Sequence, residues 1–405
     1  MSGPIRPYLA LAALSLLFFV ITAGSFTSLG VVLPEMVMAL HWNWQEAGLG
    51  YTVLGVTCGL ASLAPALVIR RLGVRPALFL GGVLMAGGLM GFSTASTTAR
   101  YLLGAAALGV GFALLATIPA TYVLSKLFKH LSAAFGVYFT IGGLGAAAGP
   151  LLYNLARAGG LDWRGYWVVL AVVTLASAAL AAALCDVPPD EPAPAPDAQE
   201  AIEGWSVADA LRTPNFWIIT AAYTAYLLCE TSVNGLSVAH LTGRGIAPAV
   251  AAGMLSLQAL VNAAGRAASG ALGERIKPRT LVIAALALTA GGIAALALAR
   301  GYPLMILYVL GVGLGYGVSY LAATVLLLDT FGRRKNLELF SLMCLVSTLA
   351  AAGPWIGGAL KDRTGGFEGA FWLFAAVAAV ALVAVVLMRP LRSPQASAMA
   401  DSSRP

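Results

Sequence analysis

The chain has 405 residues, of which 60% are hydrophobic and only 10% are charged, and its mean hydropathy is +0.86. This composition lies far outside that of soluble globular domains and indicates a membrane protein, whose constant partner is the lipid bilayer. The formal net charge is +7, but the lysines and arginines stand singly between apolar segments, which argues against a nucleic-acid partner.

Apolar segments long enough to cross a bilayer follow one another along the chain. A bilayer core of about 30 Å needs about 20 apolar helical residues, and the charged or Pro/Gly-rich breaks divide the sequence into twelve such spans. The predicted spans are 8–33, 47–69, 76–96, 100–124, 132–156 and 165–185, then 214–240, 247–272, 280–299, 303–328, 337–360 and 368–388. We therefore expect an all-α membrane protein with two six-helix bundles, residues 1–185 and 212–388.

Polar segments separate these bundles and end the chain. Residues 186–211 are acidic and rich in Pro and Ala, which is typical of a solvated linker, and residues 389–405 form a polar tail. If the termini and the linker are cytoplasmic, most lysines and arginines fall on the cytoplasmic side, so the positive-inside rule predicts an N-in/C-in orientation. The first apolar run is longer than a signal-peptide core and is expected to be retained. The prediction is a multi-pass protein of the cell inner membrane that works as a monomer.

The two halves carry a repeated pattern. The loop RRLGVRP at 70–76 aligns with ERIKPRT at 274–280, and the same offset aligns AAAGP ending at Pro150 with AAAGP ending at Pro354. Parallel six-helix repeats are the arrangement of major facilitator transporters, in which the substrate site lies between the halves near the bilayer midplane. The repeated loops supply four arginines that we expect to pair with helix C-termini and with acids across a cytoplasmic gate: Arg71, Arg75, Arg275 and Arg279.

One arginine lies within a predicted span, where a charge costs about 2.5 to 3.5 kcal/mol and is a functional candidate by default. Arg266 follows Gln258 and Asn262 at intervals of four residues, so one face of this helix carries all three polar side chains. A guanidinium is always charged and makes two parallel hydrogen bonds, which suits a carboxylate substrate better than a sugar or a cation. The alternative is a side chain that extends to the cytoplasmic interface.

Further candidates are an acid and three tyrosines. Glu230 is the only acid well inside a span and is a candidate proton carrier, although a structural hydrogen-bonding role fits it equally well. Tyr316 and Tyr320 share one helical face, and Tyr122 has a similar case; their hydroxyls are candidate substrate contacts, and packing is the alternative. Nothing resembles a catalytic triad, a phosphate-binding loop or a metal cluster, so neither an enzyme nor a cofactor is expected.

The segment SKLFKHLSAAFGVYFTIGGLG, at 125–145, is similar to the motif of the monocarboxylate transporter family and its bacterial oxalate/formate antiporter relatives. The Asn262/Arg266 pair also resembles that family, in which an arginine follows a polar or acidic residue one turn earlier. The resemblance implies the major facilitator fold and transport of small monocarboxylates such as lactate or pyruvate, usually by symport with a proton. Position 262 is Asn where many eukaryotic members have an acid, so the resemblance does not imply proton coupling through this pair. A single buried cation favours a monocarboxylate over oxalate.

Two other functions are compatible with the same sequence features. An exporter of drugs or other metabolites would have the same fold, with Arg266 as a packing group, and an oxalate/formate-type anion exchanger would share the motif. A membrane sensor or enzyme has little support, because the sequence contains no soluble domain larger than the linker.

Overall fold

The computed structural model describes residues 6–128, 131–185, 205–272, 276–332, 335–389 and 391. Every element within these ranges is helical, and eleven helical spans are long and apolar enough to cross a membrane. A further span consists of α3 (Trp44–Leu60) and α4 (Ala64–Leu72), which are bent by 50° around a short 3-10 turn. The predicted all-α protein of twelve spans is confirmed, and the bend falls inside the span predicted at 47–69.

The first group of helices runs from α1 to α9. Pro34 lies inside α2 without ending it, so the first span continues to Leu40 rather than stopping at residue 33. Neighbouring helices commonly make a proline tolerable in a membrane span. Besides α3 and α4, the group contains α1 (Arg6–Ala23), α2 (Phe26–Leu40), α5 (Val74–Ser93), α6 (Thr98–Leu115), α7 (Thr117–Leu127), α8 (Leu131–Ala158) and α9 (Trp163–Leu184).

The second group runs from α10 to α17. It contains α10 (Val207–Leu211), α11 (Pro214–Gly243), α12 (Pro248–Leu272), α13 (Pro278–Leu298), α14 (Tyr302–Phe331), α15 (Asn336–Ser347), a 3-10 turn (Thr348–Ala352), α16 (Gly353–Thr364) and α17 (Glu368–Leu387). Trp205 donates its backbone N–H to the Phe331 carbonyl, and α10 packs on α11 and α15. Residues 205–211, predicted as linker, therefore pack with this group, whereas residues 186–204 lie outside the described ranges.

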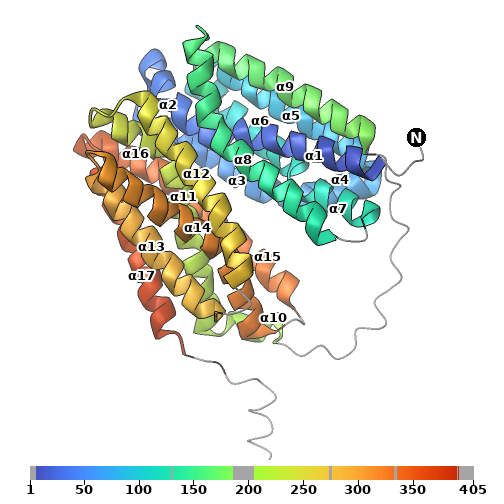
Figure 1. Ribbon diagram of the computed structural model, residues 1–405, viewed down its shortest axis with the longest axis vertical. Coiled ribbons are helices and arrows are strands. Elements are labelled where there is room, and N and C mark those ends of the chain that lie inside the picture. Colours follow the sequence, from blue (N-terminus) through green and yellow to red (C-terminus); the bar gives the residue numbers. More distant parts are fainter. Residues whose placement is uncertain are drawn as a thin grey trace, which may run out of the picture.

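We call the end where α2 finishes and α3 begins the far end, and the opposite one, where α1 begins and α17 finishes, the termini end. The two groups are in contact from the far end into the middle of the spans, where Gly59 of α3 lies against Thr348 and Gly143 of α8 lies against Ala263 of α12. Between the groups, α2 packs on α11, α3 on α16, and α8 on α12. Toward the termini end the groups diverge, and the start of α1 and the last turn of α17 lie far apart in Figure 1.

Glycines bring the backbones of the two groups into contact at the far end. A Cβ on Gly30 of α2 would collide with the Asn234 carbonyl of α11, and one on Gly48 of α3 would collide with the Pro354 carbonyl. Only residues without a side chain permit so close an approach. The far end is therefore closed by backbone packing and not by side chains alone.

Candidate functional site

Arg266 is held with its side chain turned toward the middle of the membrane span. Its Nε donates a hydrogen bond of 3.1 Å to Oδ1 of Asn262, which lies one turn nearer the far end. The guanidinium carbon is 5.5 Å from the ring centroid of Tyr316 and 5.2 Å from that of Tyr320, both on α14. These are distances at which the face of an aromatic ring attracts a cation. The side chain does not extend along α12 toward the termini end, as snorkelling would require.

A glycine on α14 explains how the tyrosines reach this position. A Cβ at Gly317 would collide with the Asn262 carbonyl and crowd the Arg266 backbone nitrogen, so α12 and α14 can approach only because this residue is Gly. On its other side, the Tyr316 ring packs edge-on against Tyr226 of α11, with centroids 5.2 Å apart. Tyr226 was not among the residues predicted from the sequence, although it lies one turn before Glu230.

Glu230 is buried between α11 and α12 and is hydrogen-bonded on both carboxylate oxygens. Gln258 Nε2 donates to Oε2 at 3.1 Å, and Asn234 Nδ2 donates to Oε1 at 3.3 Å. Only 7% of Glu230 is exposed, and a buried carboxyl group requires such donors. The positive charge of Arg266 also acts on this carboxyl group. The acid and the guanidinium thus belong to one polar cluster formed by α11, α12 and α14.

Each of the two side-chain amides that donate to Glu230 has a carbonyl oxygen without a hydrogen bond from any described residue. Among the described residues, Oε1 of Gln258 and Oδ1 of Asn234 are buried and accept no hydrogen bond. Gln258, placed by sequence among the substrate contacts, is fully buried and faces Glu230 rather than Arg266. Its position indicates a role in orienting the acid.

The repeated loop arginines occupy equivalent positions in the two groups. Arg75 donates from Nη2 to the Ala183 carbonyl in the last turn of α9, at 3.3 Å. Arg279 donates to the carbonyls of Val385 and Val386 in the last turn of α17, at 3.1 and 2.8 Å. Both arginines therefore satisfy carbonyls left free at a helix C-terminus, where a positive charge also complements the helix dipole. Each of these contacts stays within one group.

The remaining candidates lie apart from the polar cluster. Arg71 is exposed, and Arg275 lies outside the described residues. Tyr122, in the middle of α7, accepts a hydrogen bond from Lys126 at 2.7 Å. Within the described part of the chain, no group of three or more His, Cys, Asp or Glu side chains could hold a metal ion.

A contact across the two groups was also missed from the sequence. Asp362, near the end of α16, accepts the backbone N–H groups of Trp44 and Gln45 in the first turn of α3. In the sequence, Asp362 stands among Lys361 and Arg363 at a predicted span end, where an acid is ordinary. Only the packing of α3 on α16 reveals its partner.

The fold and the cluster agree with a family comparison. The family model of the Major Facilitator Superfamily matches residues 14–352 and, in a second match, residues 228–403. The chain belongs to the Major Facilitator Superfamily. It is thus a multi-pass membrane transporter of this superfamily, as the paired loops and the repeated halves predicted.

Two curated relatives of this major facilitator protein are named as monocarboxylate transporters. The chain is 28% identical over 361 residues to monocarboxylate transporter 3 of Rattus norvegicus, covering 81% of this chain and 70% of the relative. It is 27% identical over 366 residues to monocarboxylate transporter 13 of Bos taurus, covering 86% and 81%. The resemblance to the monocarboxylate transporter family is therefore confirmed, at low identity.

Solved structures support the fold. A bacterial homologue of the human lysosomal transporter Spinster, described as inward-facing and unoccupied, superposes with a TM-score of 0.67 at 18% identity, covering 96% of each chain. The nucleoside transporter NupG, as a D323A mutant, superposes with a TM-score of 0.76 at 16% identity, covering 94% of this chain and 99% of its own. At such identities these likenesses concern architecture only.

Proposed function

We propose that this protein is a secondary transporter of small monocarboxylates such as lactate or pyruvate, with Arg266 as the residue that binds the carboxylate. The observation that carries the proposal is the orientation of this guanidinium, which Asn262, Tyr316 and Tyr320 direct into the span. Its Nε donates to Asn262, and the guanidinium carbon lies 5.5 Å from the Tyr316 ring centroid and 5.2 Å from that of Tyr320. Two parallel N–H groups match the two oxygens of one carboxylate.

The proposed coupling ion is a proton carried by Glu230. An anion crossing the span carries a charge-burial cost of several kcal/mol, which falls when a proton travels with it. Glu230 is buried, interacts electrostatically with Arg266, and is held by two neutral amides. An anion at Arg266 would weaken the electrostatic stabilisation of the Glu230 carboxylate and so favour its protonation.

Transport would proceed by rocking of one helix group against the other. We assign the termini end to the cytoplasm, as the positive-inside count predicts, in a protein that functions as a monomer in the inner membrane. The closed far end and the divergent termini end then correspond to an inward-facing state. One of the similar structures is described as inward-facing as well.

The test is uptake of radiolabelled lactate into proteoliposomes, with and without an inwardly directed proton gradient. We expect accumulation that depends on the gradient, and a loss of about thirtyfold in Arg266→Gln because the charge-assisted hydrogen bonds to the carboxylate are removed. Arg266→Lys should restore the charge but not the paired N–H geometry, and should recover only part of the rate.

Arg363→Gln is the matched control, because Arg363 is exposed and belongs neither to the polar cluster nor to the loop arginines assigned to the gate. It should transport lactate at the wild-type rate. Lactate uptake that is equally low with and without a gradient, in wild type and in Arg266→Gln alike, would overturn the proposal and favour an exporter of other metabolites.

A further inference from the structure

A cavity lies at the far end, away from the Arg266 cluster. Its volume is about 490 Å³, within the range of pockets that hold small organic ligands. Met38 of α2 and Trp44 of α3 line it from the first group, while Arg244, Lys361 and Phe367 line it from the second. The cavity is therefore complete only while the two groups are in contact at this end.

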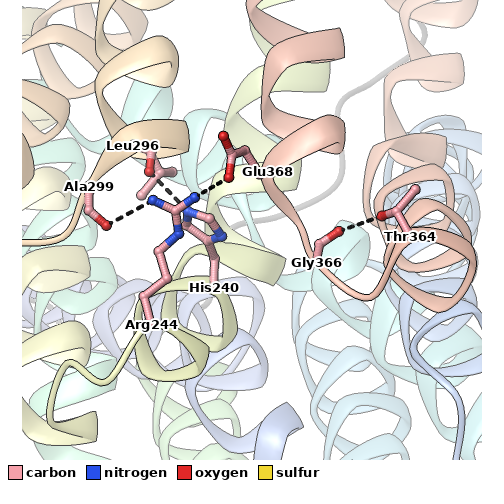
Figure 2. Close-up of polar contacts among 7 residues, drawn as sticks. All are labelled: His240, Arg244, Leu296, Ala299, Thr364, Gly366 and Glu368. Carbon is pink, nitrogen blue, oxygen red and sulfur yellow. Dashed lines mark hydrogen bonds and ion pairs between the residues drawn. The ribbon is translucent and has the colours of Figure 1, made fainter.

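The charged groups of this cavity are predominantly positive. Arg244, Arg300 and Lys361 line it, against a single acid, Glu368. Figure 2 shows that Arg244 is already engaged, since it lies between the Ala299 carbonyl and the Glu368 carboxylate. The remaining two cations have no acid to neutralise them in the cavity wall.

These two cations retain free donors. Among the described residues, Arg300 makes no hydrogen bond or ion pair, and its side chain is exposed. The Lys361 ammonium donates one hydrogen bond to the Gly365 carbonyl, which leaves two of its three N–H groups free. The neighbouring acid, Asp362, is not part of the lining and accepts the α3 backbone N–H groups instead. An anion in the cavity would thus meet two available cationic donors.

The rest of the wall is apolar and aromatic. Trp44 and Phe367 pack edge-to-face with ring centroids 4.9 Å apart, and Met38 and Pro34 lie on the same lining. The Lys361 ammonium stands 5.6 Å from the Phe367 ring centroid, so cationic and aromatic surfaces adjoin. This combination suits a ligand with a negative head and an apolar body.

We propose that this far-end cavity is a second binding site, for an organic monocarboxylate with an aromatic or branched aliphatic body, whose carboxylate is bound by Arg300 and Lys361. The site is separate from Arg266 and does not depend on which substrate the central cluster carries. Because both helix groups supply its walls, a bound anion stabilises the far-end-closed state, and opening of the far end releases it.

The test is equilibrium binding of radiolabelled benzoate to purified full-length protein that carries Arg266→Gln, so that the central cluster does not contribute. We expect saturable binding that unlabelled benzoate displaces and neutral benzamide does not. Arg300→Gln and Lys361→Gln, each added to this background, should weaken binding about tenfold, the loss expected for one charge-assisted hydrogen bond. Arg300→Lys should recover part of the affinity.

Arg363→Gln is the matched control, because Arg363 lies at the same end of α16 but not in the cavity wall. It should bind benzoate as the Arg266→Gln background does, and each variant should elute from gel filtration as a single species. Absence of saturable binding, displacement by benzamide as effective as by benzoate, or equal affinity in Arg300→Gln, Lys361→Gln and Arg363→Gln would each overturn the proposal. Lactate uptake by the wild-type protein tests the central site independently.

Discussion

Gln45, in the first turn of α3, donates its backbone N–H to the Asp362 carboxylate at 2.8 Å, across the boundary between the two helix groups. The other carboxylate oxygen accepts the N–H of Trp44 at 3.1 Å. The first N–H groups of a helix have no partner within it, and a negative charge there is favoured by the helix dipole. This contact exists only while the far end is closed.

Asp362→Asn should therefore shift the protein toward states with an open far end. The amide keeps one acceptor oxygen but removes the charge, at a cost of about 0.5–2 kcal/mol to the closed state. Distances between spin labels at Met38 and Arg363, measured by double electron–electron resonance, should lengthen in a larger share of molecules. Glu46→Gln is the control, since this acid lies in the same turn of α3 and, among the described residues, forms no ion pair with the other group. An unchanged distance distribution in Asp362→Asn would contradict the assigned role.

Gly30→Ala should disfavour the closed far end for a steric reason. The added methyl group would overlap the Asn234 carbonyl, and backbone on both sides leaves no flexible side chain to move aside. We expect the same lengthening of far-end distances, together with slower lactate transport. Gly87→Ala places its methyl group in open space and should behave as wild type. Normal transport by Gly30→Ala would mean that α2 and α11 need not touch during the cycle.

Glu230→Gln should separate exchange from proton-driven accumulation. The substitution preserves size and retains an acceptor for Gln258 or Asn234, but it cannot release a proton. We expect lactate exchange across the membrane to persist, while accumulation driven by a pH gradient is lost. Proteoliposomes preloaded with lactate, compared with empty ones, provide both measurements. Gradient-driven accumulation in Glu230→Gln would assign proton transfer to another group.

Arg279→Ala should destabilise the second helix group without changing substrate affinity. It leaves the Val385 and Val386 carbonyls without their charged donor, a loss of about 1–3 kcal/mol. A lower unfolding temperature of the purified protein, with an unchanged KM for lactate, is the expected result. Arg71→Ala is the matched control, since Arg71 is exposed and comes from the equivalent loop of the first group. Equal unfolding temperatures would contradict the capping role.

The central cluster was largely predictable because its main signal is local. Gln258, Asn262 and Arg266 follow one helical face, and an ionisable group in an apolar span is conspicuous in any sequence. The hydrogen-bond partners of these residues were not predictable from the sequence. Gln258 bonds Glu230 rather than lining the site with Arg266, because α11 and α12 cross at that level.

Contacts between the two helix groups have no comparable signal in the sequence. Asp362 and Gln45 are more than 300 positions apart, as are Trp44 and Phe367. Their residue types are ordinary for the ends of membrane spans, so periodicity carries no information about the pairing. The bend between α3 and α4 was not predicted for another reason. Pro65 lies in the first turn of α4, a typical proline position, but the apolar run continues through the bend and prolines are tolerated within membrane spans, so one straight span was predicted.

The polar contacts described around Arg266 and Glu230 all come from α11, α12 and α14, within a single helix group. A substrate bound there would move together with the second helix group, while the first group would move relative to both. Substrate selectivity and transport rate would then be determined by different helices. Changes on α11, α12 or α14 would alter what is carried, and changes on α2 or α3 would alter how fast.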